Sequence, residues 1–160
     1  MARIGRGGLS VSSTNLIPTL PGLRANDLIN TNTDEEEWLA FKQHTAATFP
    51  EFLIYRELTR RRLKEGEDFD FQSAALGGKK QLGGAVIDFI LYGYIAGRVQ
   101  GLYWHFRTIG QKASDIIQRA ILEGTGYTVV DMLEDEIIEA PSRVARLLID
   151  GRETGKAQAK

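Results

Sequence analysis

The sequence predicts a mixed α/β (α+β) domain in which helices flank a central sheet. Apolar residues recur at helical spacing within 34–65 and after about Ala113, whereas β-branched and aromatic runs fill 85–100 and 127–133. Glycine and proline separate these segments. From Pro50 onward the order is helix, strand, strand, strand, helix, strand, helix, which is typical of a sandwich built on one central sheet.

The bulk composition excludes several classes of protein. The chain has 160 residues, 42% hydrophobic and 26% charged, with a net charge of −1, so it is not a polycation that coats nucleic acid nonspecifically. Cysteine is absent, which excludes disulfides, thiolate catalysis and cysteine-ligated zinc. No apolar run has the length of a membrane span, so we expect no membrane contact and a location in the cytoplasm, or within a virion if the chain is phage-encoded.

The domain organisation follows from the distribution of small and polar residues. Residues 1–33 are rich in Gly, Ser, Thr, Asn and Pro, which predicts an extended arm that is flexible or bound to a protein partner. We expect a single domain over 34–150. Residues 151–160 are predicted to form a polar tail.

Two helices are expected before the first strand. The first has Thr33 or Asp34 as its N-cap and ends before Pro50; the second starts at Pro50 and ends at Gly66. An apolar face of the second helix is predicted to face inward, and it comprises Phe52, Leu53, Tyr55, Leu58 and Leu63. A cationic run occupies the rest and is either a solvated face or a phosphate contact: Arg56, Arg60, Arg61, Arg62 and Lys64.

The strands are expected at 69–72, 85–92, 94–101 and 127–133. A turn with two Gly pairs around Lys79 and Lys80 precedes the second strand, and Gly93 joins the second and third in a hairpin. A helix is expected from about Ala113 to Gly124 or Gly126, and a last amphipathic helix from Pro141 to Ile149.

One carboxylate, Asp88, stands in the middle of the apolar run "AVIDFILY". It is either a strand carboxylate that faces water or a metal ligand, because burying a charge costs several kcal/mol unless a cation compensates it. Gln100 and His105 follow the paired strand, so both could approach Asp88. His105 is then either a base that activates a metal-held water or a ring packed on Trp104.

The stretch from Glu51 to about Asp135 resembles the PD-(D/E)XK nuclease superfamily, most closely the very short patch repair endonucleases and their phage-borne relatives. Four segments in matching order carry the resemblance: "PEFLIYREL" with Glu51, "SAALGGKKQLGGAVIDF", "VQGLYWH" and "SDIIQRAILEGTGYTVV". It implies a restriction-endonuclease-like mixed central sheet and DNA cleavage with Mg²⁺ or Mn²⁺.

The resemblance also implies roles for individual residues. Asp88 is similar to the metal-binding aspartate, Glu51 to the helix carboxylate that reaches the metal through water, and Val99 to the residue that lends its carbonyl. His105 matches the base, and Asp115 matches an acid that orients a histidine. Gln100 stands where the family has a histidine; its oxygen can bind a metal or water, but it cannot exchange protons.

Other family features are missing. No lysine stands two places beyond Gln100, so Lys79 or Arg98 would have to substitute for it, and the structural zinc ligands and the DNA-wedging insertion of the repair enzymes have no counterpart. We therefore expect a metal-dependent DNA endonuclease without mismatch specificity. The alternative is a catalytically weakened nuclease-fold protein that is a structural or DNA-binding component of a phage particle or other assembly. Backbone phosphates are expected to contact Arg60, Arg61, Lys79, Lys80 and Arg98.

Overall fold

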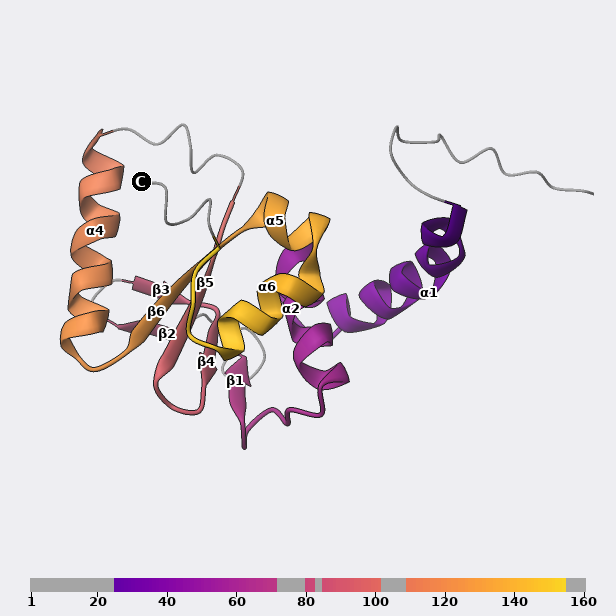
Figure 1. The fold of residues 1–160 in the computed structure, drawn as a ribbon, viewed down its shortest axis with the longest axis horizontal. Helices are drawn as coiled ribbons and strands as arrows, with labels where there is room; N and C mark the ends of the chain where they lie inside the picture. Colours follow the sequence, from indigo (N-terminus) through magenta and orange to yellow (C-terminus); the bar gives the residue numbers. More distant parts are fainter. Residues whose placement is uncertain (1–24, 72–79, 83–84, 102–108, 155–160) are drawn as a thin grey trace, which may run out of the picture. The chain divides into compact units, whose positions relative to one another are not determined.

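The computed structural model describes residues 25–71, 80–82, 85–101 and 109–154, with side chains from residue 34 onward except those of 80–82 and 85. The chain divides into two compact units, Met1–Glu35 and Glu36–Lys160. The described residues form five helices and six strands, which confirms the mixed α/β class (Figure 1). Of the first unit, only residues 25–35 are described, and they are helical. Apart from the first part of helix α1, all that follows concerns the second unit.

A four-stranded mixed sheet in the order β1-β4-β5-β6 is the centre of this unit. Its strands are β1 (Phe69–Phe71), β4 (Phe89–Leu91), β5 (Ile95–Gln100) and β6 (Thr128–Leu133). β4 pairs antiparallel with both β1 and β5. β6 pairs parallel with β5, and helix α4 (Ile109–Gly124) connects these two strands in the chain. The predicted hairpin between the two strands around Gly93 is confirmed for residues 89–91 and 95–97.

The run before β4 differs from the prediction. A second, two-stranded sheet joins β2 (Lys80–Leu82) to β3 (Ala85–Ile87), so the predicted turn at 80–82 is wrong. The predicted single strand at 85–92 is also wrong, because the chain bends at Asp88 and separates β3 from β4.

Helix α2 (Phe49–Arg60) begins at an N-cap formed by Thr48, with Pro50 in its first turn as predicted. It ends at Arg60 rather than at Gly66, because Arg62 takes a left-handed φ of 67° that breaks the helical hydrogen bonding. Helix α1 (Ala25–Lys42) begins nine residues before the predicted start and ends well before Pro50. Extending a formed helix costs less than nucleating one, so residues of modest helix propensity can precede the acidic run.

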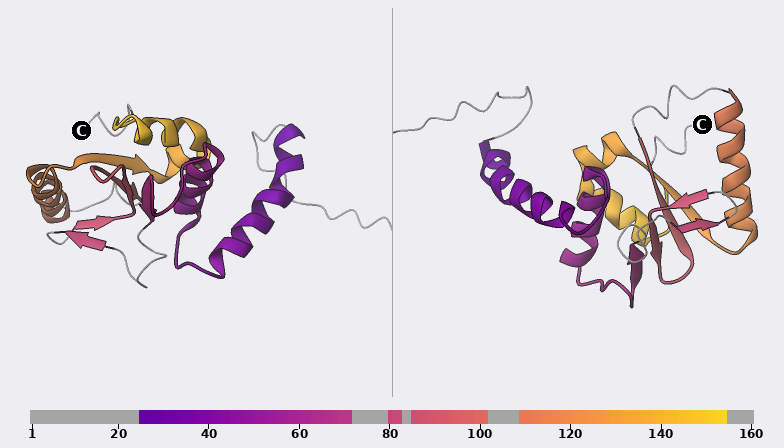
Figure 2. Two further views of the ribbon diagram at one scale, coloured as in Figure 1. Left: turned by 90° about the horizontal axis from the view of Figure 1, so that it is seen from below. Right: turned by 180° about the vertical axis from the view of Figure 1, so that it is seen from behind.

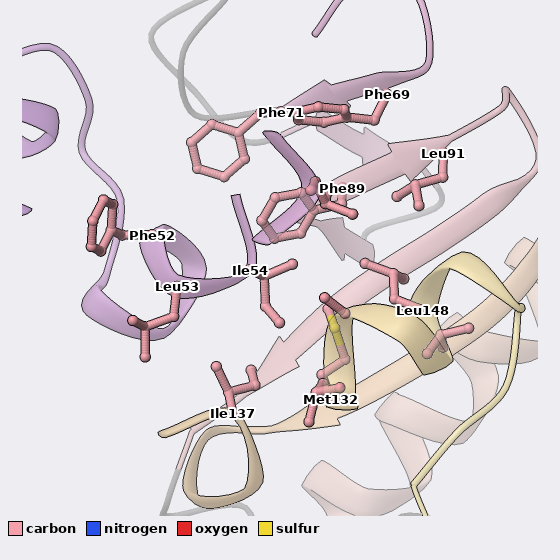
Figure 3. Close-up of a cluster of buried hydrophobic side chains, with 14 of the residues drawn as sticks. Phe52, Leu53, Ile54, Phe69, Phe71, Phe89, Leu91, Met132, Ile137 and Leu148 are labelled. Atoms are coloured by element: carbon pink, nitrogen blue, oxygen red, sulfur yellow. The ribbon is translucent and has the colours of Figure 1, made fainter. Parts of the chain in front are cut away.

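The larger apolar core lies on one face of the sheet, under α2, α5 (Glu134–Glu139) and α6 (Pro141–Ile149). Figure 3 shows Ile54 of α2 between Phe89 of β4 and Ile137 of α5, with Leu148 of α6 on its other side from Phe52 and Leu53. Phe71 and Phe89 stack with ring centroids 5.0 Å apart. The predicted inward face of α2 is largely confirmed, since Phe52, Leu53 and Leu58 are buried.

The opposite face carries α4 and the β2–β3 hairpin; Figure 2 (left) shows the hairpin and α6 on opposite sides of the sheet. Its apolar cluster is small and comprises Ile87, Ile90, Ala96, Leu122 and Val129. α4 begins at Ile109, four residues before the predicted start. No helix in the described part of the chain is long and apolar enough to cross a membrane.

At Gly97 in β5 the side chain of Leu148 from α6 lies close to the sheet backbone. A Cβ atom at this position would lie 2.8 Å from Cδ1 of Leu148 and 3.2 Å from Cε of Met132. A contact under 3 Å forces a displacement, so a larger residue at 97 would first push aside the side-chain ends of Leu148 and Met132.

Candidate functional site

Asp88 forms a β-bulge between β3 and β4. Its N–H donates to the carbonyl of Gly97 at 3.0 Å, although Gly97 is already the register partner of Phe89, so two residues oppose one. Side-chain direction gives the same result. Ile87 packs in the cluster under α4 and Phe89 in the core under α2, whereas regular alternation would put both on one face.

The bulge brings the carboxylate of Asp88 against β5. Asp88 is only 3% exposed, and its Oδ2 accepts a hydrogen bond from the N–H of Val99 at 2.7 Å. The side chain therefore continues the β4–β5 ladder beyond the last backbone pair. Bulges of this kind re-aim side chains and are frequent beside active sites.

The carbonyl of Val99 is the second predicted ligand. Three covalent bonds separate it from its own N–H, a path of about 4 Å, so it lies less than about 7 Å from Oδ2 of Asp88. In a regular strand the N–H and C=O of one residue point to the same side. The Val99 carbonyl therefore lies on the same side of β5 as Asp88. Two oxygens that bind one Mg²⁺ at about 2.1 Å lie within about 4.2 Å of each other, so a metal shared by these two groups stays a prediction.

Glu51 has a structural role in α2. It stands at the third position of the helix, is 1% exposed, and accepts the N–H of Thr48 through Oε2 at 2.7 Å, forming a capping box. This hydrogen bond fixes the carboxylate at the start of α2. A water-mediated link from Glu51 to a metal stays a prediction.

Beyond Asp88, on the α4 face, a buried polar network surrounds Asp131 of β6. Arg98 is the register partner of Asp131 and binds it with two hydrogen bonds, from Nε at 2.8 Å and from Nη2 at 2.9 Å. Nε2 of Gln100 donates to the same carboxylate at 3.0 Å. From α4, Nη1 of Arg119 donates to Oδ2 of Asp131 at 3.0 Å.

Two further carboxylates complete this network. Asp115 of α4 accepts Nη1 of Arg98 at 3.3 Å, and Glu153 accepts Nη1 of Arg119. Burial alone would raise the pKa of Asp131, but the hydrogen bonds and charge of Arg98, the amide of Gln100 and the charge of Arg119 outweigh it and hold the pKa below 3.8. Burial alone would lower the pKa of Arg119, but the hydrogen bonds to Glu153 and Glu123 outweigh it and raise the pKa above its ordinary value. Arg119 therefore stays protonated.

The network changes the meaning of three predicted site residues. Arg98 is 3% exposed, and its guanidinium donates to both Asp131 and Asp115. This argues against its predicted roles as a phosphate contact or as a substitute for the missing lysine. Gln100 is 5% exposed, and its amide nitrogen donates to Asp131. Its predicted role of binding a metal or water through the amide oxygen stays a prediction. Asp115 orients a guanidinium; its predicted histidine partner is not described.

Arg60 and Arg61 lie at the other end of α2 from Glu51, roughly 14 Å along the helix axis. Arg60 pairs with Glu57 at 3.5 Å and Glu37 at 3.7 Å, and Arg61 pairs with Glu57 at 2.7 Å. Nη2 of Arg61 also donates to the carbonyl and the hydroxyl of Ser142, which fastens α2 to α6. These arginines therefore already have intramolecular partners, although Arg60 remains half exposed.

Three predicted residues cannot be placed. His105 and Lys79 lie outside the described residues, and Lys80 is described only as the first backbone position of β2. Among described side chains, no group of three or more His, Cys, Asp and Glu residues could hold a metal ion. The predicted ligands Asp88, Glu51 and the Val99 carbonyl include only two carboxylates, so the lack of such a group does not test them and the metal site stays a prediction.

Asp131, Arg119 and Glu153 were missed by sequence reasoning. Asp131 carried the same signal as Asp88, since it is the one charged residue within the apolar run "YTVVDML". Arg98 carried it too, in "YIAGRVQ". Opposite charges in the middle of two apolar strands predict a pair if the strands are neighbours.

Comparison with protein families, curated proteins and solved structures gives no significant match to any of them.

Proposed function

We propose that this chain is a metal-dependent DNA endonuclease of restriction-endonuclease-like fold, with Asp88 as its metal ligand. The supporting observation is the bulge that turns the Asp88 carboxylate onto the end of β5, where the "VQGLYWH" segment begins. The segments that carry the family resemblance fall on α2, on β2, β3 and the first residue of β4, on the end of β5, and on α4 and β6; of these strands, β4, β5 and β6 are consecutive neighbours in one sheet.

The donor atoms suit Mg²⁺ or Mn²⁺. A carboxylate and a backbone carbonyl supply only oxygen, which hard divalent cations prefer, and Val99 contributes both the carbonyl and the N–H that orients Asp88. A bound cation of this kind polarises a phosphodiester and lowers the pKa of bound water. Asp88 would hold the ion, Glu51 would reach it through water, and His105 would accept the proton of the attacking water.

Cleavage of supercoiled plasmid tests the proposal. The wild type is expected to nick DNA with Mg²⁺ or Mn²⁺ and to stop in chelator. Asp88→Asn should abolish nicking, and His105→Ala should slow it by the ~10²–10⁴-fold typical of a lost general base. Asp70→Asn is the matched control, because Asp70 is an exposed aspartate on the neighbouring strand β1 and its change should leave the rate unaltered. Full activity in Asp88→Asn would refute the assignment.

A second candidate is a nuclease-fold protein that binds DNA or a particle component without cleaving it. The commitment of Arg98 and Gln100 to Asp131 favours it, because two polar side chains beside the proposed site serve the fold instead. Fluorescence anisotropy with labelled duplex separates the candidates. Binding without nicking in either metal, unaffected by Asp88→Asn, would select this second function.

A further inference from the structure

Helix α4 turns its apolar side away from its own sheet. Four isoleucines on it are exposed: Ile109 by 89%, Ile116 by 68%, Ile117 by 60% and Ile121 by 41%. At 3.6 residues per turn they fall within an arc of about 140°. Ala113 and Ala120 lie in the same arc and are also exposed.

The opposite side of α4 faces the sheet and is mostly polar. Leu122 is the one buried residue of this helix, while Asp115 and Arg119 bind the Asp131 network. The orientation of α4 is therefore set by charged contacts that the isoleucine face cannot make. A helix normally buries its apolar side, so an apolar side that remains outside indicates a surface that a partner covers.

We propose that this isoleucine face binds the same face of a second copy of the chain, with the two α4 helices antiparallel. The flanking charges fit this partner and this direction, with Glu123 also accepting Nε of Arg119 in its own helix at 2.8 Å. Lys112 and Glu123 are eleven residues apart and therefore lie within about 20° of each other on one flank of the face. In an antiparallel two-fold pair equal flanks meet, so Lys112 of each copy approaches Glu123 of the other.

A parallel pair would leave these charges apart. Lys112 and Glu123 are about 16 Å apart along the helix axis, and a parallel arrangement would keep that separation between copies. In the antiparallel pair, centred between Ile116 and Ile117, Ala113 of one helix opposes Ala120 of the other. These small side chains allow the two helix axes to approach closely.

The size of the surface predicts a weak dimer. The isoleucine face offers on the order of a few hundred Å² per copy, below the roughly 800 Å² per partner of a standard stable interface. We therefore expect a dissociation constant in the micromolar range, with dimers at about 50 μM protein and monomers at about 0.5 μM.

Sedimentation velocity on the full chain tests the dimer. The wild type is expected at twice the chain mass at the higher concentration, and Ile116→Glu/Ile117→Glu is expected at the chain mass. Ile138→Glu is the matched control, because Ile138 is a half-exposed isoleucine on α5 and its change should leave the dimer intact. A monomeric wild type overturns the proposal. A dimer that survives the double substitution also overturns it. The same holds if the dimer is lost in a variant without residues 1–24 but not in the double substitution.

Cross-linking tests the direction. The chain has no cysteine, so one introduced cysteine is its only thiol. Ile117→Cys lies near the two-fold axis and should form a disulfide-linked dimer on mild oxidation. Ile109→Cys should not, because residue 109 opposes residue 124 and the two copies of residue 109 are about 22 Å apart along the axis. Equal cross-linking of both variants would indicate a parallel pair and overturn the antiparallel arrangement.

Discussion

Asp88 and Asp131 are both buried aspartates that interrupt apolar runs of the same sheet, 3% and 1% exposed, and strand β5 lies between them. Towards β6, β5 presents Arg98 in register with Asp131. Towards β4, it presents the N–H of Val99 to Asp88. The same sequence signal therefore has two outcomes, and the difference lies in what the neighbouring strand offers.

The comparison separates a structural carboxylate from a candidate ligand. The charge of Asp131 is balanced inside the fold by two guanidinium groups, and the lowered pKa of Asp131 expresses that balance. Asp88 instead sits at a bulge, where the ladder ends and its carboxylate continues it. Four predictions test this distinction, in decreasing order of expected effect.

Asp131→Ala should destabilise the protein most. Removing Asp131 takes two of the three acceptors from the buried guanidinium of Arg98 and leaves only Asp115 opposite it; breaking a buried ion pair in this way costs about 3–5 kcal/mol. Urea unfolding followed by circular dichroism measures the change. Asp70→Ala, on the exposed side of β1, should change the free energy of unfolding by less than about 0.5 kcal/mol. Comparable losses in both variants would contradict the structural role of Asp131.

Replacing both members of the pair should cost less than the sum of the single changes. In Arg98→Met/Asp131→Leu, neither charge is left buried alone, and apolar side chains of similar size often replace such pairs at little cost. We expect a coupling free energy of about 1–3 kcal/mol from a double-mutant cycle with the two single substitutions. Additive effects would mean that Arg98 and Asp131 do not act as a unit.

Asp88→Asn should change stability by no more than about 1 kcal/mol in metal-free buffer, because the asparagine carbonyl can still accept the N–H of Val99. The loss of a buried charge can even raise the melting temperature. Titration calorimetry with Mn²⁺ should show heat for the wild type and none for the variant. Equal heats from both proteins would remove Asp88 from the proposed site, whatever its effect on stability.

The smallest effect concerns acid stability. Because the pKa of Asp131 is lowered in the folded state, its contribution is complete above the ordinary value of 3.8 and is lost as the pH falls through the folded pKa. The wild type should therefore lose more stability than Arg98→Met/Asp131→Leu when the pH is lowered below 4. Urea midpoints at pH 6 and pH 3 measure this difference, and parallel curves would contradict it.

Local patterns predicted much of the fold. The β-branched run before Asp131 predicted β6, Gly93 predicted the β4–β5 hairpin, and Pro50 predicted the first turn of α2. These features depend on residues close in sequence, where backbone preferences and side-chain spacing are sufficient.

The remaining features depend on contacts between distant residues. The bulge at Asp88 needs one extra residue relative to β5, and spacing within "AVIDFILY" cannot show where the ladder slips. Arg98 and Asp131 pair because β5 and β6 are parallel and in this register. The length and sequence of the helix that connects the two strands do not show that register. The apolar spacing of α4 indicates an amphipathic helix but not that Arg119 turns its apolar side outward.

Gly97 links the core to the candidate site and so constrains how both can evolve. Its carbonyl holds the backbone of Asp88, while the space that its missing side chain leaves is filled by Leu148 of α6. A mutation that adds a methyl group at 97 would displace the side-chain ends of Leu148 and Met132, and a larger side chain would displace α6 or shift β5 and the bulge with it. A smaller residue at 148 would remove the closest of these contacts. The packing of a helix on one face of the sheet thus limits which sequences can retain the position of Asp88.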